Sequence, residues 1–353
     1  MRYFAFHRSL DQTVSTAFLD LFGSPRRPET PFPVVQKPDG GIGAAREEDQ
    51  YYADVAASVQ LVTEEVLLRM ARHIASATGE RRLVMAGGVA LNSVAVGRIM
   101  REGPFDEVFV QPNAGDAGGA LGAALYVWHV LLGHPRRFVM DHAYLGEECS
   151  EAEVAAVLDR QGVPSERIEE PCRLAERIVA SLLSGKVVAL HQGRFEWGPR
   201  ALGNRSILAD PRHPAMRDVV NEKVKFREPF RPFAPAVAED AAATYFDLGR
   251  SDGQYPQRFM QMVAPARPDT AGLIPAVVHG GTARLQVVRP EWNPLFAEIV
   301  HRFGEATGIP VVLNTSLTLR GEPMAAGPLD SLNTFALSGV DALVLGRHFV
   351  EKE

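Results

Sequence analysis

Short apolar runs alternate with segments of helical periodicity along the chain, and this alternation constrains the fold more than any other feature of the sequence. Apolar runs at 83–86, 310–313 and 342–345 predict strands, while apolar residues recur at helical spacing through 298–307. Strands and helices that alternate in this way form α/β folds, in which helices cover a sheet. The sequence therefore predicts an α/β protein, with a mixed sheet in its second half.

A long helix is predicted from Asp54 onward, because apolar side chains recur every three or four residues and Gly79 follows the last of them. The residues of this apolar stripe are Val55, Val59, Val62, Val66, Met70 and Ile74. Ser150 and Glu153 have the spacing of a capping box, which marks the start of another helix. The other predicted elements are strands at 107–110, 186–190, 259–263 and 284–288 and helices at 172–183 and 328–337.

Residues 24–50 are rich in proline, glycine and charged residues, a composition typical of a long surface loop. A loop of this kind so near the first residue suggests that the chain opens midway through a larger fold. A length of 353 residues suits about two domains, and the stretch 138–146 ahead of the capping box is a candidate boundary. We therefore expect one domain at 1–145 and a second at 146–353.

Composition argues against several classes of protein. The net charge of −6 is unlike that of a dedicated nucleic-acid binder, and no apolar stretch approaches the roughly 20 residues that a membrane helix needs. Two cysteines, Cys149 and Cys172, are too few for a disulfide framework. We therefore expect a cytoplasmic protein that binds neither nucleic acid nor membrane.

One basic, glycine-containing run at 193–235 stands out against this acidic background. Its cations are Arg194, Arg200, Arg205, Arg212, Arg217, Lys223, Lys225, Arg227 and Arg231. Cations gathered on a loop-rich stretch favour binding of phosphate or carboxylate, whereas the alternative is a solvated charged surface. Aromatic residues such as Trp197, Phe230 and Phe233 lie between the cations. Because a merely solvated surface does not need them, we favour an anion-binding site.

Three further positions are candidates for ligand binding, although each has an ordinary structural alternative. Gly87 and Gly88 form a turn between a predicted strand and a helix, where backbone N–H groups can approach a phosphate, but such turns more often serve tight packing. Asp116 lies among small residues at a helix entry, either as a cap or as a carboxylate for a metal or substrate. The polar triplet 314–316 ends a predicted strand, where ligands gather in α/β folds.

Several long motifs, in the same order, closely resemble the O-carbamoyltransferases that act on antibiotics such as tobramycin and cephamycins and on nodulation factors. Those similar to the C-terminal domain of that family are GPRALGNRSILADPR (198–212), KFREPFRPFAP (225–235), TARLQ (282–286), LNTSL with GEPM (313–324) and DALVLGR (341–347). AGGVALN (86–92) and QPNAGDAGGALGAAL (111–125) resemble the second half of the first domain. The resemblance implies a partial actin-like (Kae1-like) subdomain followed by a YrdC/Sua5-like α/β domain.

The resemblance also implies two sites. In the YrdC-like domain, carbamoyl-adenylate would form from carbamoyl phosphate and ATP with Mg²⁺, and in the Kae1-like domain the carbamoyl group would pass to an acceptor hydroxyl beside a metal ion, iron in some members. By position, the residues implied for the first site are Lys225, Arg227, Arg200 and Arg231 for catalysis and Asn204, Arg205, Ser206, Arg284, Asn314 and Thr315 for binding. Those implied for the second site are Gly87, Gly88 and Asn92 for the nucleotide and Asp116 for the metal.

This chain departs from the family's pattern in two places. The family's remaining metal ligands, histidines of an HxxxH-type helix and a further aspartate, lie upstream of the point where this chain begins, together with the phosphate loops. We therefore expect a separate N-terminal Kae1-like chain to supply them, and a sugar or another natural product to supply the acceptor hydroxyl. The second departure is HGGTAR (279–284), where the family usually reads HVDGTAR, so Arg284 is a more secure assignment than His279.

Two alternatives remain beside the carbamoyltransferase interpretation. One is a factor for tRNA threonylcarbamoylation or hydrogenase maturation, against which the acidic charge and the lack of zinc-finger cysteines argue. The other is a non-catalytic nucleotide-binding or regulatory subunit left by gene fission. Nucleotide binding without turnover would favour the second.

Overall fold

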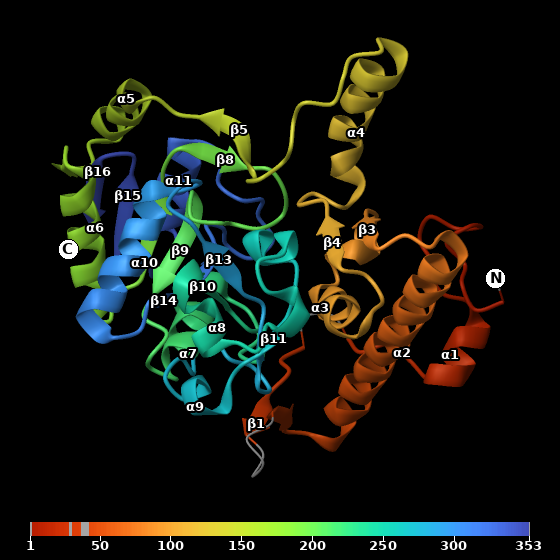
Figure 1. Ribbon diagram of the computed structural model, residues 1–353. Helices are drawn as coiled ribbons and strands as arrows, with labels where there is room; N and C mark the ends of the chain where they lie inside the picture. The colour runs from red at the N-terminus through yellow and green to blue at the C-terminus, as the bar shows by residue number, and fades with distance from the viewer. Residues whose placement is uncertain (1, 28–29, 37–41, 353) are drawn as a thin grey trace. The chain divides into compact units, whose positions relative to one another are not determined.

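Figure 1 shows the computed structural model, which describes residues 2–27, 30–36 and 42–352. The chain divides into two compact units, Met1–Val59 and Gln60–Glu353, which are described separately. Helix α2 (Glu47–Thr78) begins in the first unit and ends in the second. The long helix predicted from Asp54 is therefore confirmed, with an earlier start.

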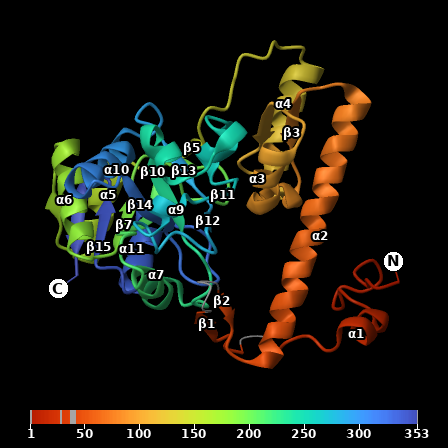
Figure 2. The same cartoon turned by 60° about the horizontal axis from the view of Figure 1, so that its bottom comes forward.

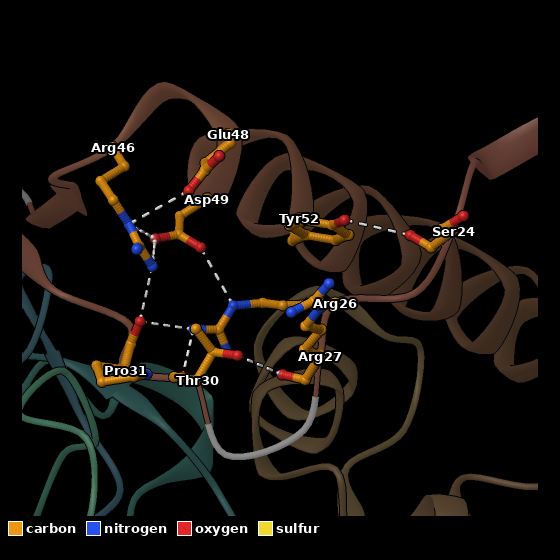
Figure 3. Close-up of polar contacts among 9 residues, drawn as sticks. All are labelled: Ser24, Arg26, Arg27, Thr30, Pro31, Arg46, Glu48, Asp49 and Tyr52. Atoms are coloured by element: carbon orange, nitrogen blue, oxygen red, sulfur yellow. Dashed lines mark hydrogen bonds and ion pairs between the residues drawn. The ribbon is translucent and has the colours of Figure 1, made fainter.

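Asp49 joins the start of α2 to the preceding segment of the first unit. Its carboxylate accepts hydrogen bonds from Arg26 Nε at 3.1 Å and from Arg46 Nε at 2.6 Å. Both guanidinium groups also donate to the carbonyl oxygen of Pro31, as Figure 3 shows. The other elements of this unit are α1 (Thr16–Phe22), β1 (Val34–Gln36) and β2 (Ile42–Ala44), the last two paired antiparallel. The segment predicted as a surface loop therefore contains two strands, and its residues 28–29 and 37–41 lie outside the described residues.

The first part of the second unit is a parallel two-stranded ribbon that packs on helices. β3 (Arg82–Met85) pairs with β4 (Glu107–Val110), in agreement with the strands predicted there. Val108 and Val110 face a core that they share with α2 and α3 (Ser93–Glu102). The short elements of this part are η1 (Gly88–Leu91), η2 (Asp116–Gly118), α4 (Gly119–Tyr126) and the π-helical turn η3 (Val127–Leu131).

Helix α2 has two apolar faces beyond residue 60, and the core takes only one of them. Leu67, Leu68 and Ala71 pack against α3 and β4 in the core. The predicted stripe lies on the other side of the helix, where Val62, Val66, Met70 and Ile74 are exposed. Periodicity therefore identified the helix but not the face that this unit buries.

An eight-stranded mixed sheet forms the centre of the second part of this unit. Its strands run in the order β13-β10-β14-β9-β7-β15-β16-β6. The β7–β15 and β10–β13 pairs are parallel, and the other pairs are antiparallel. The strands are β6 (Glu166–Arg167), β7 (Val188–His191), β9 (Arg205–Ala209), β10 (Ala234–Ala238), β13 (Gln286–Val288), β14 (Val311–Ser316), β15 (Ala342–Leu345) and β16 (His348–Glu351). The predicted α/β class with a mixed sheet is confirmed.

Helices cover both faces of this sheet (Figures 1 and 2). α6 (Pro171–Leu183) and α10 (Pro294–Thr307) pack against each other on one face, over Leu190 and Val344. The helices on the other face are α5 (Glu151–Gln161), α7 (Met216–Val220), α8 (Ala242–Tyr245) and α11 (Pro328–Ala336). Because both faces are covered, every residue of β7, β9 and β15 is buried, and these strands read as continuous apolar runs broken by few polar residues.

Local sequence signals account for the ends of two of these helices. Ser150 Oγ accepts a hydrogen bond from Glu153 N at 3.2 Å, and the Glu153 carboxylate accepts one from Ser150 N at 2.8 Å, so the predicted capping box at α5 is confirmed. α10 ends at Gly308, whose φ of 76° is left-handed. The side chains of Phe296, Ile299, Val300 and Phe303 on this helix are all fully buried.

The strand predicted at 259–263 is wrong. A 3₁₀-helix, η7 (Tyr255–Phe259), occupies its start, and the backbone that follows bonds to the ribbon part of the unit instead of to a sheet. Val263 N donates to Ser93 O at 2.9 Å, and Val263 O accepts from Arg101 Nη1 at 2.7 Å. The apolar residues of this segment are therefore buried by contacts with α3, which periodicity cannot distinguish from burial in a sheet.

Short elements complete the unit. They are β5 (Tyr144–Glu148), β8 (Arg194–Glu196), β11 (Ala264–Pro265), β12 (Thr282–Ala283), α9 (Pro268–Ala271), η4 (Asn221–Lys225), η5 (Glu239–Ala241) and η6 (Gly249–Ser251). Cys149 and Cys172 are both free thiols. Across the residues that the structure describes, no helix combines the length and the apolarity that a membrane crossing requires.

Candidate anion-binding site

Five cationic side chains of the second unit form the candidate site, which we call the cationic cluster. Its members are Arg200, Lys225, Arg227, Arg231 and Arg284. Arg200 lies between β8 and β9, Lys225 ends η4, and Arg284 follows β12 far along the sequence. Their charges interact: Arg227 and Arg231 lower the pKa of Lys225, and Arg200 and Arg227 lower that of Arg284, in each case after the larger effect of burial. The structure therefore brings together the cations predicted to act together.

Lys225 is buried in the wall of the site. It ends η4, a π-helical turn that continues α7, and the next residue, Phe226, has a left-handed φ of 45° that stops the helix. The ammonium group donates to the carbonyl oxygens of Ser316 and Thr318, the latter at 2.9 Å, and to Ser316 Oγ at 3.2 Å. Burial lowers the pKa of Lys225 to about 7, and the neighbouring arginines add to the effect. This lysine therefore sits near the midpoint of its titration at neutral pH.

Arg227 is held in one orientation by three neighbours. Its Nε donates to Asn221 Oδ1 at 2.7 Å, its Nη2 donates to Pro232 O at 3.2 Å, and its guanidinium carbon lies 4.6 Å from the centroid of the Phe233 ring. Burial and the charge of Arg231 lower the pKa of Arg227 to about 10, so it stays charged at neutral pH. These contacts leave its Nη1 without a protein acceptor among the described residues.

Arg200 and Arg284 have polar atoms that the protein does not satisfy. Arg284 Nε is buried without a hydrogen-bond partner, and burial lowers the pKa of this group to about 9. Burial also lowers the pKa of Arg200, for which no hydrogen-bond or ion-pair partner occurs among the described residues. Buried donors without partners are costly. Arg200 is only half-buried, so water can reach its donors, whereas Arg284 Nε has no contact with water.

A tight turn holds Arg284 in the cluster. His279 N donates to Thr282 O at 2.8 Å and Thr282 N donates to His279 O at 3.0 Å, around Gly280 and Gly281. Both glycines have left-handed φ values, 53° and 72°, which a two-residue hairpin of this twist requires. The HGGTAR departure is therefore a well-formed hairpin, and β12 leads directly from it to Arg284.

The cluster has little negative charge to balance it. Within the described ranges its only ion pair joins Arg231 to Glu228 at 3.8 Å. Other cations of the same basic run are neutralised: Arg212 binds Asp210 at 2.6 Å, and Arg217 binds Asp218 at 3.3 Å. The basic run therefore separates into a structural part and a part that keeps its positive potential, and only the second suits an anionic ligand.

A cavity of about 890 Å³ lies beside residues that contact or precede members of the cluster, although none of the five cations is among its lining residues. Ser316 and Thr318, which accept hydrogen bonds from Lys225, line it, and so do Gly198 and Pro199, which precede Arg200. Its other lining residues are Phe195, Glu322, Pro323, Met324, Ala325, Ala326, Asp330, Asn333, Thr334 and Leu337. The charged residues of its lining are Glu322 and Asp330, so the phosphate groups of a ligand with an organic part in this cavity would have to face the neighbouring cations.

Glu196 positions the loop that carries Arg200, a role that no sequence pattern predicts. One carboxylate oxygen, Oε1, accepts from the backbone N–H groups of Leu202 and Asn204 at 2.8 Å and of Arg205 at 3.2 Å. Burial raises the pKa of Glu196, and these amide donors oppose the rise. A single acidic residue between aromatic neighbours has no diagnostic spacing, so only the contacts identify it.

Arg205 does not line the cavity. Its side chain is fully buried and donates from Nε to Ala326 O at 3.2 Å and from Nη1 to Gln192 O at 2.7 Å, although Nη2 has no partner in the described chain. These bonds tie together the backbone around the site. Protein covers this guanidinium group, and the ligand contact predicted for Arg205 stays a prediction.

The predicted amide and hydroxyl positions lie nearby, but several are occupied by protein contacts. Asn204 Nδ2 donates to Arg194 O at 2.7 Å, and its Oδ1 accepts from Asn293 Nδ2 at 2.8 Å. Ser206 Oγ accepts from Gly203 N at 2.9 Å. Asn314 Nδ2 donates to Gln286 Oε1 at 2.8 Å, while its Oδ1 is buried without a partner among the described residues. Thr315 follows Asn314 on β14 and is half-buried.

Gly203 shows why this loop needs its glycine. Its φ is 112°, and a Cβ atom placed there would lie 2.4 Å from the ring of Phe296 in α10. Any larger residue would push the loop off the helix that supports it. Packing of Gly203 on Phe296 and the hydrogen bonds to Glu196 therefore hold the loop that carries Arg200 in place.

The residues predicted for the second site lie in the ribbon part of the unit. Gly87 has a φ of 97° and bonds to Ala114 O at 2.7 Å, and Gly88 begins η1. Asn92 caps α3 by accepting from Ala95 N at 3.2 Å and exchanges amide hydrogen bonds with Gln60, a structural role. Asp116 is exposed at the start of η2.

The described residues do not form a metal site. No three His, Cys, Asp or Glu side chains within 2–27, 30–36 and 42–352 are close enough together to hold a metal ion. Asp116 is a single carboxylate, and the metals implied for this site need several protein ligands. The residues present therefore do not fit a metal centre by themselves.

Comparisons with known proteins agree over most of the chain. The family models "Carbamoyltransferase N-terminus" and "Carbamoyltransferase C-terminus" match residues 2–125 and 179–352. The predicted domain boundary at 145/146 falls between the two matched ranges and stays a prediction. A solved structure, full-length HypF in its phosphate- and nucleotide-bound form, has a TM-score of 0.36 at 14% identity over 54% of this chain and 23% of that chain, too weak a likeness to support an argument.

Curated relatives are considerably longer than this chain. An uncharacterized protein of Synechocystis sp. is 38% identical over 100% of this chain and 58% of its own length. Nodulation protein NolNO of Sinorhizobium fredii is 41% identical over 86% of this chain and 44% of its own length, and nodulation protein NolO of Bradyrhizobium diazoefficiens is 38% identical over 86% and 55%. The chain thus spans about half the length of the curated relatives it matches.

Proposed function

Because the chain belongs to the carbamoyltransferase family, we propose that it is the ATP-dependent part of an O-carbamoyltransferase. It would form carbamoyl-adenylate from carbamoyl phosphate and ATP, and the carbamoyl group would then pass to a hydroxyl of a small-molecule natural product. The observation that carries the proposal is the cationic cluster, in which, among the described residues, Arg284 Nε is buried without a partner and no carboxylate pairs with Arg200, near a cavity of about 890 Å³.

The reaction requires concentrated positive charge. Carbamoyl phosphate would lose its phosphate to water to give carbamate, and a carbamate oxygen would attack the α-phosphorus of ATP. The bond from the α-phosphorus to the bridging oxygen breaks, and pyrophosphate leaves with that electron pair. Negative charge builds on both the attacked phosphate and the leaving group, so preorganised cations lower the barrier. Mg²⁺ bound to ATP would neutralise part of the pyrophosphate charge.

Each member of the cluster suits a part of this task. The planar guanidinium groups of Arg200 and Arg284 can clamp phosphate oxygens with two hydrogen bonds each. Burial lowers the pKa of Lys225 to about 7. A bound anion would raise this pKa again, because it stabilises the protonated lysine. Arg227 is already oriented by Asn221 and Phe233. Little reorganisation is then needed when the substrates bind.

We propose that transfer of the carbamoyl group to the acceptor requires protein residues beyond those of this chain. The acceptor oxygen would attack the carbamoyl carbon of carbamoyl-adenylate, and AMP would leave as the hydroxyl loses its proton. Asp116 is the only residue assigned to the metal at that step, and the described chain does not complete a metal site around it. We therefore propose that a separate N-terminal Kae1-like polypeptide provides the remaining ligands for iron or another divalent metal.

Release of pyrophosphate tests the adenylation step. The chain should release pyrophosphate when ATP, carbamoyl phosphate and Mg²⁺ are all present, and Lys225→Ala should reduce the rate at least about 100-fold, because loss of one preorganised charge costs about 3 kcal/mol in a buried site. Lys223→Ala is the matched control, since Lys223 lies on the same turn but is exposed. Nucleotide binding by calorimetry without pyrophosphate release would overturn the proposal in favour of a non-catalytic subunit.

A further inference from the structure

Lys225 is the one deeply buried lysine among those that the structure describes. Its exposed fraction is 5%, whereas Lys186 is half-buried and Lys223 and Lys352 are exposed. No carboxylate of the described chain pairs with the Lys225 ammonium group, and the charges that act on it are those of Arg227 and Arg231. Burial beside other cations favours the neutral amine over the ammonium ion. A neutral lysine amine is a nucleophile.

The hydrogen bonds of Lys225 determine where the lone pair of the neutral amine lies. Two of its partners, the carbonyl oxygens of Ser316 and Thr318, can only accept hydrogen bonds, while the third is Ser316 Oγ at 3.2 Å. A neutral amine has two hydrogens, which the two carbonyl oxygens hold, and a hydroxyl group can face the lone pair because it also donates. Ser316 lines the cavity of about 890 Å³. The lone pair therefore lies on the cavity side of the lysine.

The arginines of the cluster would hold an anionic reagent close to this amine. Arg227 Nη1 has no protein acceptor among the described residues, and Arg284 Nε is buried without one. Carbamoyl phosphate, the donor in the proposed reaction, is a small anion with an electrophilic carbonyl carbon. Guanidinium groups stay protonated and bind such an anion without reacting with it. Lys225 is therefore the group of the cluster that can form a bond to the carbamoyl carbon.

We propose that Lys225 is a site of covalent carbamoylation by carbamoyl phosphate when no nucleotide is bound. Lys225 Nζ attacks the carbamoyl carbon, and the bond from this carbon to the phosphate oxygen breaks. Phosphate leaves with that electron pair and takes up the proton that the amine loses. The product is a neutral carbamoyl-lysine, so the cluster loses one of its positive charges. The inference rests on the proposed function for the identity of the reagent.

A bound nucleotide prevents this reaction for two reasons. Its phosphate groups occupy the arginines that would hold carbamoyl phosphate, and their negative charge stabilises the protonated form of Lys225, which has no lone pair. ATP must therefore bind before the carbamoyl donor. A chain that meets carbamoyl phosphate first loses part of its affinity for anions, and the order of substrate addition regulates the site.

Peptide mass spectrometry tests the modification after the chain has been incubated with carbamoyl phosphate alone. Lys225 should gain a carbamoyl group at least about tenfold faster than Lys223, which lies exposed on the same turn, because a lower pKa leaves more of the amine neutral. ATP or sulfate, present from the start, should each slow the labelling of Lys225 at least about fivefold. Equal labelling of the two lysines would overturn the proposal. So would labelling that sulfate leaves unchanged, because isocyanate formed in solution would then be reacting without help from the arginines.

Sulfate affinity provides a second readout. Prior incubation with carbamoyl phosphate, followed by its removal, should weaken sulfate binding to the native chain at least about threefold, because one charge is lost. The Lys225→Arg variant has no amine at this position, so the same treatment should leave its sulfate affinity unchanged. An equal loss in this variant would contradict the assignment to Lys225. Pyrophosphate release reports the proposed function separately: labelling without release retains this site and removes adenylation, and release without labelling removes this inference alone.

Discussion

The eight-stranded sheet and the β3–β4 ribbon belong to the same unit, but one is enclosed and the other is not. β7 and β15 are buried along their whole lengths, with helices on both sides, whereas residues of β3 alternate between the core and the solvent. The candidate anion site lies entirely in the enclosed region. The enclosed region can therefore hold its site in one geometry, while the region that carries Asp116 exposes apolar side chains such as Val84 and Val89.

The largest effect should come from removing a core ring in the enclosed region. Phe296→Ala should lower the free energy of unfolding by about 3–5 kcal/mol, because it leaves a cavity between α10 and the sheet. The same variant removes the ring beneath Gly203, so the loop with Arg200 should lose its support and anion affinity should fall as well. Equilibrium unfolding in guanidinium chloride measures the first effect and sulfate titration the second. A loss below 1 kcal/mol would contradict the enclosed core.

A slightly smaller effect is expected from Glu196→Ala. Three buried N–H groups would lose their shared acceptor, at a cost of about 2–3 kcal/mol in unfolding free energy after partial relaxation. Glu196→Gln keeps one oxygen in place and should cost less than half as much. If both variants unfold like the native chain, the loop is held by packing alone.

A matched pair of substitutions compares the two regions directly. Val344→Thr in β15 should lower the unfolding free energy by about 1–3 kcal/mol, because the hydroxyl enters a fully buried position. Val84→Thr in β3 makes the same chemical change on an exposed surface and should alter stability by less than about 0.5 kcal/mol. Equal losses at the two positions would show that Val84 is covered even in the isolated chain.

The smallest expected effect is a pH dependence of anion affinity. An anion raises the lowered pKa of Lys225, so binding takes up a proton when the free lysine is neutral, and affinity is complete below about pH 7 and decreases as the pH rises above it. The limit is a tenfold loss, about 1.4 kcal/mol, per pH unit. Calorimetric titration with sulfate from pH 6.5 to 9 measures it. Lys225→Arg stays charged and should remove the dependence; a dependence that persists in this variant would exclude Lys225 as its source.

Sequence reasoning succeeded where the determining interactions are local. The capping box at Ser150 and the periodicity of α10 depend on neighbours within one or two helical turns, and both were predicted correctly. The strand at 259–263 was wrong because its apolar residues are buried against α3, more than 150 residues earlier in the chain. The exposed stripe of α2 was misjudged for the same reason, because residue spacing identifies an apolar face of a helix but not the element that covers it.

Sequence motifs identified most of the cations of the candidate site, but they did not predict how those side chains are oriented. The charges of Lys225, Arg227, Arg200 and Arg284 do interact, and short motifs in the sequence were enough to name these four residues. Arg205 belongs to the same motif, but its guanidinium group binds backbone carbonyls, a distinction that requires three-dimensional contacts. Glu196 was missed for the same reason.

The two-glycine hairpin at 279–282 also fixes the strand register of Arg284. β12 pairs with β11 at Ala264↔Ala283 and Pro265↔Thr282, so the side of the hairpin that leads to Arg284 is anchored. Alternate residues of a strand point to opposite faces. An insertion that shifted β12 by one residue would therefore turn Arg284 away from the cluster. The length of this hairpin thus determines how many positive charges the cluster contains.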